Sequence, residues 1–312
     1  MVDDDGAIVN RAISEPGIGR ARSRSGYTRL HDPQCLDCII RAMGNDLIVK
    51  PHPAATVMLL RDGDDGMEVF MIVRHHESDV HAGALVFPGG RVDPEDYDLA
   101  VDAAVFPAQD DVDEAMAVLR VAAVRETFEE CGVLLARARG EKALVSAARL
   151  REIEAEHRAA MTGGKRTFGA ILAAEDLVLA PDTMVYFANW ITPERSTKRF
   201  DTHFFLAAAP SDQVALHDGQ EAVDSVWIRP GNALERARAG TYDLRFPTQM
   251  NLQKLGRHPL SATAMDAARA NPVVTVMTKQ ERTGNGKRVL RIPLEAGYGG
   301  ELFEVPDPPS IL

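Results

Sequence analysis

Cysteine is scarce in this sequence, with three copies in 312 residues, which excludes the disulfide framework of a small secreted protein. No unbroken apolar run is long enough to cross a bilayer. The opening residues, MVDDDG, are acidic and lack the apolar core of a secretory signal. We therefore expect a soluble, cytoplasmic protein that does not associate with membranes.

Positive charge is also in deficit, because 35 lysines and arginines face 46 aspartates and glutamates, for a net charge of −11. Proteins that coat nucleic acids usually present a basic face, so this balance argues against a nucleic-acid partner. A small anionic substrate is still compatible with the sequence, since it needs only a local patch of arginine, lysine or metal ion.

The first 50 residues lack apolar periodicity and carry many arginines, serines and glycines, which is typical of a partly flexible N-terminal extension. Cys35 and Cys38 form a CxxC pair there, with His31 four residues ahead of it. A zinc site normally requires a second ligand pair at suitable spacing, and the chain offers only His52 nearby. We interpret the segment as a tail and leave the function of the CxxC pair open.

From residue 54 the pattern becomes regular. Apolar, β-branched runs at 54–60 and 68–74 flank a turn-rich stretch and predict a hairpin, and 83–87 indicates a short strand. Apolar residues then recur at spacings of three and four, which predicts a helix from about Asp113 to Gly132. Further helices are expected near 142–161, 168–176, 232–240, 246–256 and 262–270, and further strands near 183–193, 200–210, 222–230, 273–277, 288–294 and 301–305. This mixed order predicts an α+β fold with helices on both faces of a mixed sheet.

Three acids gather in the predicted helix, within the stretch RETFEECGV. Helical residues three and four apart share a face, so Glu126 aligns with Glu129 and Glu130. Like charges at this spacing weaken a helix, and a hard divalent cation such as Mg²⁺ or Mn²⁺ would offset the repulsion. Arg125 can hold one carboxylate by paired hydrogen bonds. The alternative is a solvated acidic face, but the apolar residues beside the acids favour a binding site.

The same stretch, together with the glycine pair at 89–90, resembles the signature of the Nudix hydrolases. That signature is G-x5-E-x7-R-E-U-x-E-E-x-G-U, where U is an aliphatic residue. Residues 125–133 fill its second half in order, and the one departure there is Thr127 in an aliphatic slot.

The first half of the signature is interrupted in this chain. Gly90 and Arg125 lie 35 positions apart where the signature has fourteen, which places an insertion at about 93–112. Asp96 takes the place of the first glutamate by counting forward from Gly90, and Glu114 is the rival if the insertion precedes it. An interrupted box of this kind resembles the NUDT19-like branch of acyl-coenzyme A diphosphatases.

The resemblance covers about residues 50–260 and implies the Nudix fold, an α/β/α sandwich around a mixed central β-sheet. It divides the chain into an extension at 1–50, a Nudix domain at 51–260, and a C-terminal helix with short strands at 261–312 that pack on that domain. Relatives often pair, so a homodimer is left open.

The resemblance also implies a metal-dependent hydrolase that cleaves the diphosphate bond of coenzyme A or acyl-coenzyme A, releasing 3′,5′-ADP and 4′-phosphopantetheine. Glu126, Glu129, Glu130 and the carbonyl of Gly90 would hold Mg²⁺ or Mn²⁺, and Arg125 would orient the acids. The first alternative is a pyrophosphatase for ADP-ribose, dinucleotides or other nucleoside diphosphate derivatives. The second is a nucleotide sensor without catalysis, which the intact set of acids disfavours.

A further motif of coenzyme A hydrolases ends in G-x3-F-P-G-G, and residues 83–90 reproduce that ending. The motif also has an arginine four residues before its first glycine, a place that Asp79 occupies here, and Arg74 could serve as its more distant arginine. The partner we expect is a small-molecule nucleoside diphosphate substrate. The candidate substrate-binding residues are Arg74, His81, Phe87, Gly89, Arg91 and Arg199.

Overall fold

The computed structural model describes residues 48–74, 84–110, 112–213, 215 and 222–306. The CxxC pair with His31, and the candidate residue His81, lie outside these described residues. The helices of the described ranges include none that combines the length and apolar character needed to cross a membrane. The cytoplasmic location and the homodimer stay predictions.

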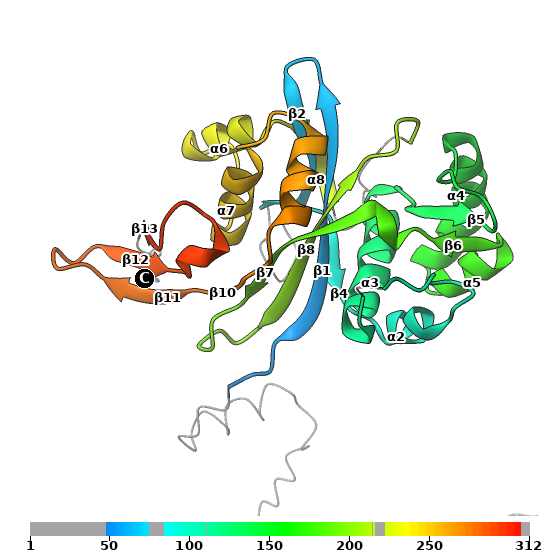
Figure 1. The fold of residues 1–312 in the computed structure, drawn as a ribbon, viewed down its shortest axis with the longest axis horizontal. Helices are drawn as coiled ribbons and strands as arrows, with labels where there is room; N and C mark the ends of the chain where they lie inside the picture. The colour runs from blue at the N-terminus through cyan, green and yellow to red at the C-terminus, as the bar shows by residue number, and fades with distance from the viewer. Residues whose placement is uncertain (1–47, 75–83, 111, 214, 216–221, 307–312) are drawn as a thin grey trace, which may run out of the picture. The chain divides into compact units, whose positions relative to one another are not determined.

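A mixed sheet forms the centre of the fold, as the sequence predicts (Figure 1). Its strands run in the order β10-β7-β8-β1-β2-β3, with β4 also paired to β1 and β9 to β2. β1 lies parallel to β8 and antiparallel to β2 and β4. The strands are β1 (His52–Gly63), β2 (Gly66–Arg74), β3 (Leu85–Val86), β4 (Gly89–Arg91), β7 (Met184–Ile191), β8 (Phe200–Ala208), β9 (Ala222–Ile228) and β10 (Thr275–Met277).

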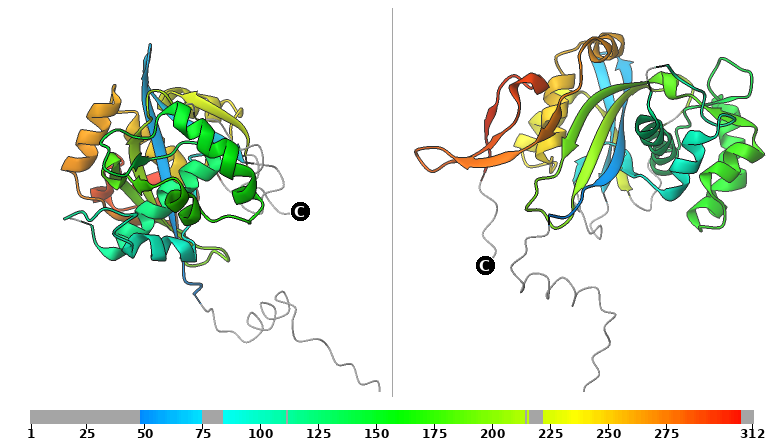
Figure 2. Two further views of the ribbon diagram at one scale, coloured as in Figure 1. Left: turned by 90° about the vertical axis from the view of Figure 1, so that its right-hand side faces the viewer. Right: turned by 60° about the horizontal axis from the view of Figure 1, so that its bottom comes forward.

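The two faces of this sheet carry different helices, and β1 shows why. Its side chains alternate between faces, so Val57 and Leu59 enter one apolar core while Met58 and Leu60 enter another. Figures 1 and 2 show the two helical layers that complete these cores. The first core contains α2 (Pro94–Val101), α3 (Glu114–Cys131), α4 (Ala147–Thr162) and α5 (Phe168–Ala174), and the second contains α6 (Pro230–Arg238), α7 (Phe246–Leu255) and α8 (Ser261–Ala270).

Helix α3, which carries the three acids, has clear signals at both ends. The Asp113 carboxylate accepts a hydrogen bond from the Met116 amide at 2.8 Å, which satisfies a backbone donor of the first turn. Gly132 ends the helix with φ 63° and ψ 23°, a left-handed conformation that glycine adopts without steric cost. Thr127 fits its aliphatic slot because it is fully buried and its hydroxyl donates to the Ala123 carbonyl at 2.7 Å.

The insertion in the box contains a helix that the periodicity did not reveal. α2 starts at Pro94 after the N-cap Asp93, whose side chain and that of Asp96 form a capping box. At eight residues it is too short to display a repeating apolar face. This helix of the insertion packs beside α3.

Smaller elements complete the described chain. β5 (Ala136–Ala138) and β6 (Leu177–Leu179) form an antiparallel pair beside α4 and α5. At the C-terminal end, β10 joins the main sheet next to β7, and a separate three-stranded sheet follows, made of β11 (Lys279–Arg282), β12 (Arg288–Arg291) and β13 (Leu302–Glu304). The domain boundaries at 50 and 260 stay a prediction.

Candidate active site

The glycine bend at the start of β4 is shaped by the strand beside it. Gly89 has φ 151°, and a Cβ placed on it would lie 2.4 Å from the Ala55 carbonyl oxygen and 2.6 Å from the Thr56 Cα. No side chain fits at that distance from backbone atoms that β1 fixes. The bend therefore depends on glycine for close backbone approach.

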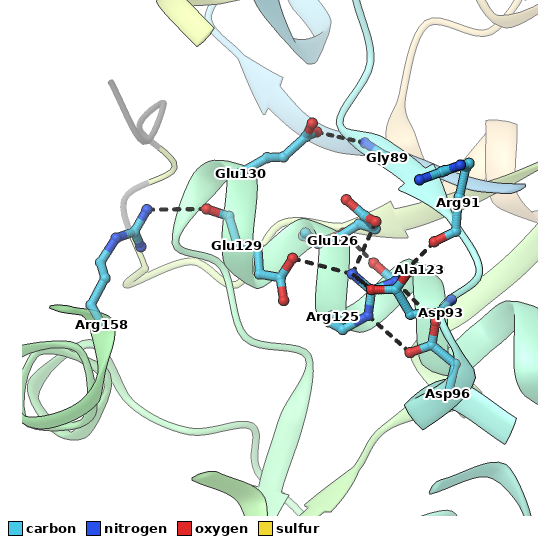
Figure 3. Close-up of polar contacts among 11 residues, drawn as sticks. Gly89, Arg91, Asp93, Asp96, Ala123, Arg125, Glu126, Glu129, Glu130 and Arg158 are labelled. Atoms are coloured by element: carbon cyan, nitrogen blue, oxygen red, sulfur yellow. Dashed lines mark hydrogen bonds and ion pairs between the residues drawn. The ribbon is translucent and has the colours of Figure 1, made fainter. Parts of the chain in front are cut away.

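The second glycine of the bend meets the acid helix directly. A Cβ on Gly90 would lie 2.4 Å from Oε1 and 2.7 Å from Oε2 of Glu126. The absence of a side chain at this position is what leaves room for the Glu126 carboxylate. Figure 3 shows that carboxylate directed from α3 toward the β4 strand.

Glu130 connects the same two segments through a hydrogen bond. The Gly89 amide donates to its Oε2 at 2.7 Å, and the residue is only 3% exposed. Two of the three clustered acids, Glu126 and Glu130, thus lie against the glycine bend (Figure 3). The two sequence segments, separated by the insertion, belong to one site.

Arg125 is the cation that orders these acids. It is 3% exposed, and its Nη1 donates to Glu126 Oε1 at 3.0 Å and to Glu129 Oε2 at 3.1 Å. Its Nη2 donates to the Arg91 carbonyl at 2.9 Å, which fixes α3 to β4. Burial alone would lower the pKa of the guanidinium, but its hydrogen bond to Asp96 and the charges of the surrounding carboxylates raise the pKa well above its ordinary value.

The contacts of Asp96 indicate which residue takes the place of the first glutamate of the signature. It is fully buried, and its two carboxylate oxygens accept from Arg125 Nε and Nη2, each at 2.9 Å. Its Oδ2 also accepts from the Asp93 amide at 2.8 Å. Glu114 is instead an exposed residue in the first turn of α3. The geometry thus favours Asp96, through the paired contact that arginine and carboxylate form best.

Glu129 is the most accessible of the three acids, with its side chain 33% exposed. Partial burial raises the pKa of its carboxyl group, and the charge and hydrogen bond of Arg125 oppose that rise. Its backbone carbonyl accepts a hydrogen bond from Arg158 Nη2 on α4 at 3.2 Å. This contact places a cation at the C-terminal turn of α3, where carbonyls lack helical partners.

The remaining candidate residues have varied environments. Arg91 uses its carbonyl to hold Arg125, while its side chain is exposed. Phe87 is 4% exposed and packs edge-on against Phe204 in the core beneath α6–α8. Arg74 ends β2. Their roles in substrate binding stay predictions.

Arg199 is buried, and its side chain forms hydrogen bonds with two separate backbone segments. It is 5% exposed, its Nε donates to the Thr192 carbonyl at 3.0 Å, and its Nη1 donates to the Val49 carbonyl at 2.6 Å. These contacts connect the ends of β7 and β8 with the chain that enters β1. A role in substrate binding would require Arg199 to exchange these partners.

Protein donors contact the carboxylates of Glu126, Glu129 and Glu130 in this structure. Within the described ranges, the group of three acidic or histidine side chains whose ligand atoms lie within 4.8 Å of one another is not the α3 set. It consists of Glu156, His157 and Glu175. Its buried His157 already contacts Glu175 at 2.5 Å and Arg166 at 2.8 Å, so protein groups satisfy it.

The donor set on α3 nevertheless fits a hard divalent cation. Carboxylate and backbone carbonyl oxygens are the ligands that Mg²⁺ and Mn²⁺ prefer. Glu126 and Glu130 reach the glycine bend from one helix face, and a Cβ on Gly90 would fill the space that the Glu126 carboxylate uses. These residues therefore fit a divalent cation, and their assignment as metal ligands stays a prediction.

Two residues of this arrangement were not assigned from the sequence. Counting from Gly90 brought Asp96 forward as one of two alternatives, and the capping signal of Asp93 and Pro94 could have favoured it. Arg158 carried no signal, because its contact with α3 depends on how α4 packs.

Replacing Gly90 with alanine is expected to lower hydrolytic activity at least about 100-fold, since the new methyl group must displace the Glu126 carboxylate by an ångström or more. Gly231→Ala is the matched control, because a Cβ there meets no atom within 4 Å. Steady-state rates of the two variants, with thermal unfolding to confirm folding, provide the measurement. Equal activity in both variants would contradict the tight fit at Gly90.

Comparisons with known proteins agree with this geometry. The family model described as the NUDT19 Nudix domain matches residues 101–255. Nudix hydrolase 7 of Caenorhabditis elegans is 28% identical over 189 residues, which cover 61% of this chain and 56% of that relative. The chain thus spans little more than half the length of this curated relative.

A solved structure supports the fold. The crystal structure of a NUDIX hydrolase from Alicyclobacillus acidocaldarius has a TM-score of 0.55 and 26% identity, over 70% of this chain and 97% of that chain. The similarity confirms the Nudix fold that the sequence predicts, with its α+β sandwich around a mixed sheet. The chain belongs to the Nudix superfamily, in its NUDT19-like branch.

Proposed function

We propose that this chain is a metal-dependent hydrolase that cleaves the diphosphate bond of a nucleoside diphosphate derivative, with coenzyme A or acyl-coenzyme A as substrate. One observation carries the proposal above the others: Glu126 and Glu130 meet the glycine bend although the insertion separates the two segments in sequence. Superfamily membership supports the reaction class, hydrolysis of a phosphoric anhydride.

Nudix hydrolases generally use divalent metal ions. In this chain, Glu126, Glu129, Glu130 and the Gly90 carbonyl would hold Mg²⁺ or Mn²⁺. When bound, the ion neutralises the charge of the pyrophosphate and makes water a better nucleophile near neutral pH.

The protein residues contribute orientation and proton transfer. Arg125 holds the Glu126 and Glu129 carboxylates from one side, so the two acids are ordered before substrate arrives. The Gly89 amide orients Glu130 in the same way. We assign acceptance of the proton from the attacking water to one of the nearest box acids, Glu129 or Glu130.

Coenzyme A is favoured over other nucleotides by two sequence features. The interrupted box resembles that of acyl-coenzyme A diphosphatases, and residues 83–90 reproduce the ending of a coenzyme A motif. Asp79 is the departure from that motif. ADP-ribose or a dinucleotide is therefore the second candidate, and a sensor that binds without hydrolysis is the third, which the complete set of acids opposes.

A substrate panel tests this proposal. Coenzyme A, an acyl-coenzyme A, ADP-ribose and a dinucleotide are incubated with the full chain and Mg²⁺ or Mn²⁺, and products are separated by chromatography. We expect 3′,5′-ADP from coenzyme A with kcat/KM at least about tenfold above that for ADP-ribose. Chelation of the metal should abolish the reaction, and added metal should restore it. Preference for ADP-ribose would select the second candidate, and nucleotide binding without any hydrolysis would select the sensor.

A further inference from the structure

A polar cluster joins β7 and β8 on the face of the sheet that packs against α3. We call it the β7–β8 cluster, and it consists of Tyr186, Asn189, Asp201 and His203. The Tyr186 hydroxyl lies 2.8 Å from His203 Nδ1, and the two rings stack at a centroid distance of 5.6 Å. Asp201 Oδ1 lies 3.3 Å from His203 Nε2 and accepts from Asn189 Nδ2 at 2.6 Å. Neither the diphosphate chemistry nor the apolar core accounts for this chain of hydrogen bonds.

The register of the sheet places the β7–β8 cluster beside the glycine bend. Gly90 pairs with Ala55 on β1, Ala55 pairs with His203 on β8, and His203 pairs with Asn189 on β7. Residues paired in this way share one face of a sheet, and Ala55 belongs to the core that contains α3. His203 is thus two strands from Gly90, or about 10 Å between Cα atoms at ordinary strand spacing. A nucleoside diphosphate is long enough to reach both positions.

The direction of the hydrogen bonds in the β7–β8 cluster follows from Asp201, which is a carboxylate. A carboxylate only accepts, so Asp201 requires His203 Nε2 to carry the hydrogen. In the neutral ring Nδ1 is then an acceptor, and the Tyr186 hydroxyl must donate to it. The lone pairs of the Tyr186 oxygen are left to accept from a further group. The cluster therefore suits a ligand group that donates, such as a sugar hydroxyl or a base amino group, better than a phosphate, which mainly accepts.

The charge states and exposure agree with that assignment. Burial, with the charge of Asp201, raises the pKa of the Tyr186 hydroxyl, which keeps it neutral. Hydrogen bonds from His203 and Asn189 lower the pKa of Asp201, which keeps it a carboxylate. The side chains of Asp201 and His203 are 32% and 17% exposed, so a ligand can approach them.

We propose that the β7–β8 cluster receives the nucleoside part of the substrate through hydrogen bonds from its hydroxyl or amino groups to Tyr186 and Asp201. This inference rests on the proposed function, since it takes the pyrophosphate to lie at Gly90. It divides recognition between a metal-dependent diphosphate site on α3 and β4 and a metal-free nucleoside site on β7 and β8.

The inference is tested with two ligands, one that contains a nucleoside and one that does not. AMP carries hydroxyl and amino donors, whereas inorganic pyrophosphate mainly accepts. Titration calorimetry in Mg²⁺ buffer compares the full chain with Tyr186→Phe and His203→Gln, the second of which alters the ring that orients the hydroxyl. The matched control is Tyr242→Phe, whose hydroxyl accepts from Arg236 at 3.3 Å between α6 and α7.

We expect each of the two cluster variants to raise the Kd for AMP about five- to tenfold, as for the loss of one oriented hydrogen bond. The Kd for pyrophosphate should stay unchanged, and the control should bind both ligands normally. Unchanged AMP affinity in both variants, equal weakening of the two ligands, or no AMP binding by the unaltered chain would overturn the inference. Absence of hydrolysis in the substrate panel would instead count against the proposed function and would leave this binding comparison intact.

Discussion

Replacing Glu130 with glutamine is expected to lower kcat/KM for the diphosphate substrate by about 10²- to 10³-fold. The change preserves the size of the side chain and one oxygen, so the contact with the Gly89 amide at 2.7 Å can persist. It removes the negative charge that a divalent cation requires. Steady-state kinetics in Mg²⁺ and Mn²⁺ provide the measurement, and circular dichroism confirms that the helix is retained.

Glu114→Gln is the matched control for this experiment. It makes the same substitution on the same helix, at an exposed position in the first turn. Its kcat/KM should stay within about twofold of the unaltered chain, since surface substitutions away from special features have small effects. Full activity in Glu130→Gln, or an equal loss in Glu114→Gln, would contradict the assignment of metal ligands on α3.

Replacing Asp96 with asparagine is expected to destabilise the fold by about 3–5 kcal/mol, because it leaves the buried Arg125 guanidinium without its main charged partner. Asp96 is fully buried and holds both Nε and Nη2 of Arg125 at 2.9 Å. Urea unfolding measures the loss of stability. Activity should fall as well, since Arg125 also orders the Glu126 and Glu129 carboxylates.

Asp98→Asn serves as the control on the same helix. Asp98 is exposed, so its substitution should change the free energy of unfolding by no more than about 0.5 kcal/mol. An Asp96→Asn variant as stable as Asp98→Asn would show that the buried contact contributes little. Arg125→Lys extends the test, because lysine keeps the charge and cannot form the paired contact with Asp96.

The elements that the sequence predicted well are those with strong local periodicity. The hairpin of β1 and β2, the strands β7 to β9 and the helices α3, α4 and α6 to α8 all lie near their expected positions. Some short elements were missed, among them α2, β5, β6 and β11, which span three to eight residues each. Other short elements, α5, β10, β12 and β13, lie near their expected positions. Segments of this length carry too little of a repeating apolar pattern to be predicted consistently.

The residues of the site also divide into those that the sequence predicted and those that it did not. The three acids and Arg125 were readable because they follow one another on a single helix, whose 3.6-residue period fixes their common face. The choice between Asp96 and Glu114 was not readable, since Asp96 fits the count forward from Gly90, Glu114 is the alternative if the insertion precedes it, and only the fold of the insertion separates them. The sequence also did not show that Phe87 and Arg199 are buried. Tertiary packing places Phe87 in the apolar core and Arg199 between strands.

By itself, therefore, the sequence determined the family, the α+β class and the acidic face of α3, all of which depend on short-range spacing. The tertiary structure alone decided that Asp96 anchors Arg125, that Arg158 reaches the end of α3, and that His203 and Asn189 share a row with Gly90. These contacts join residues far apart in the chain. They depend on strand register and loop closure, which a local pattern of residues does not specify.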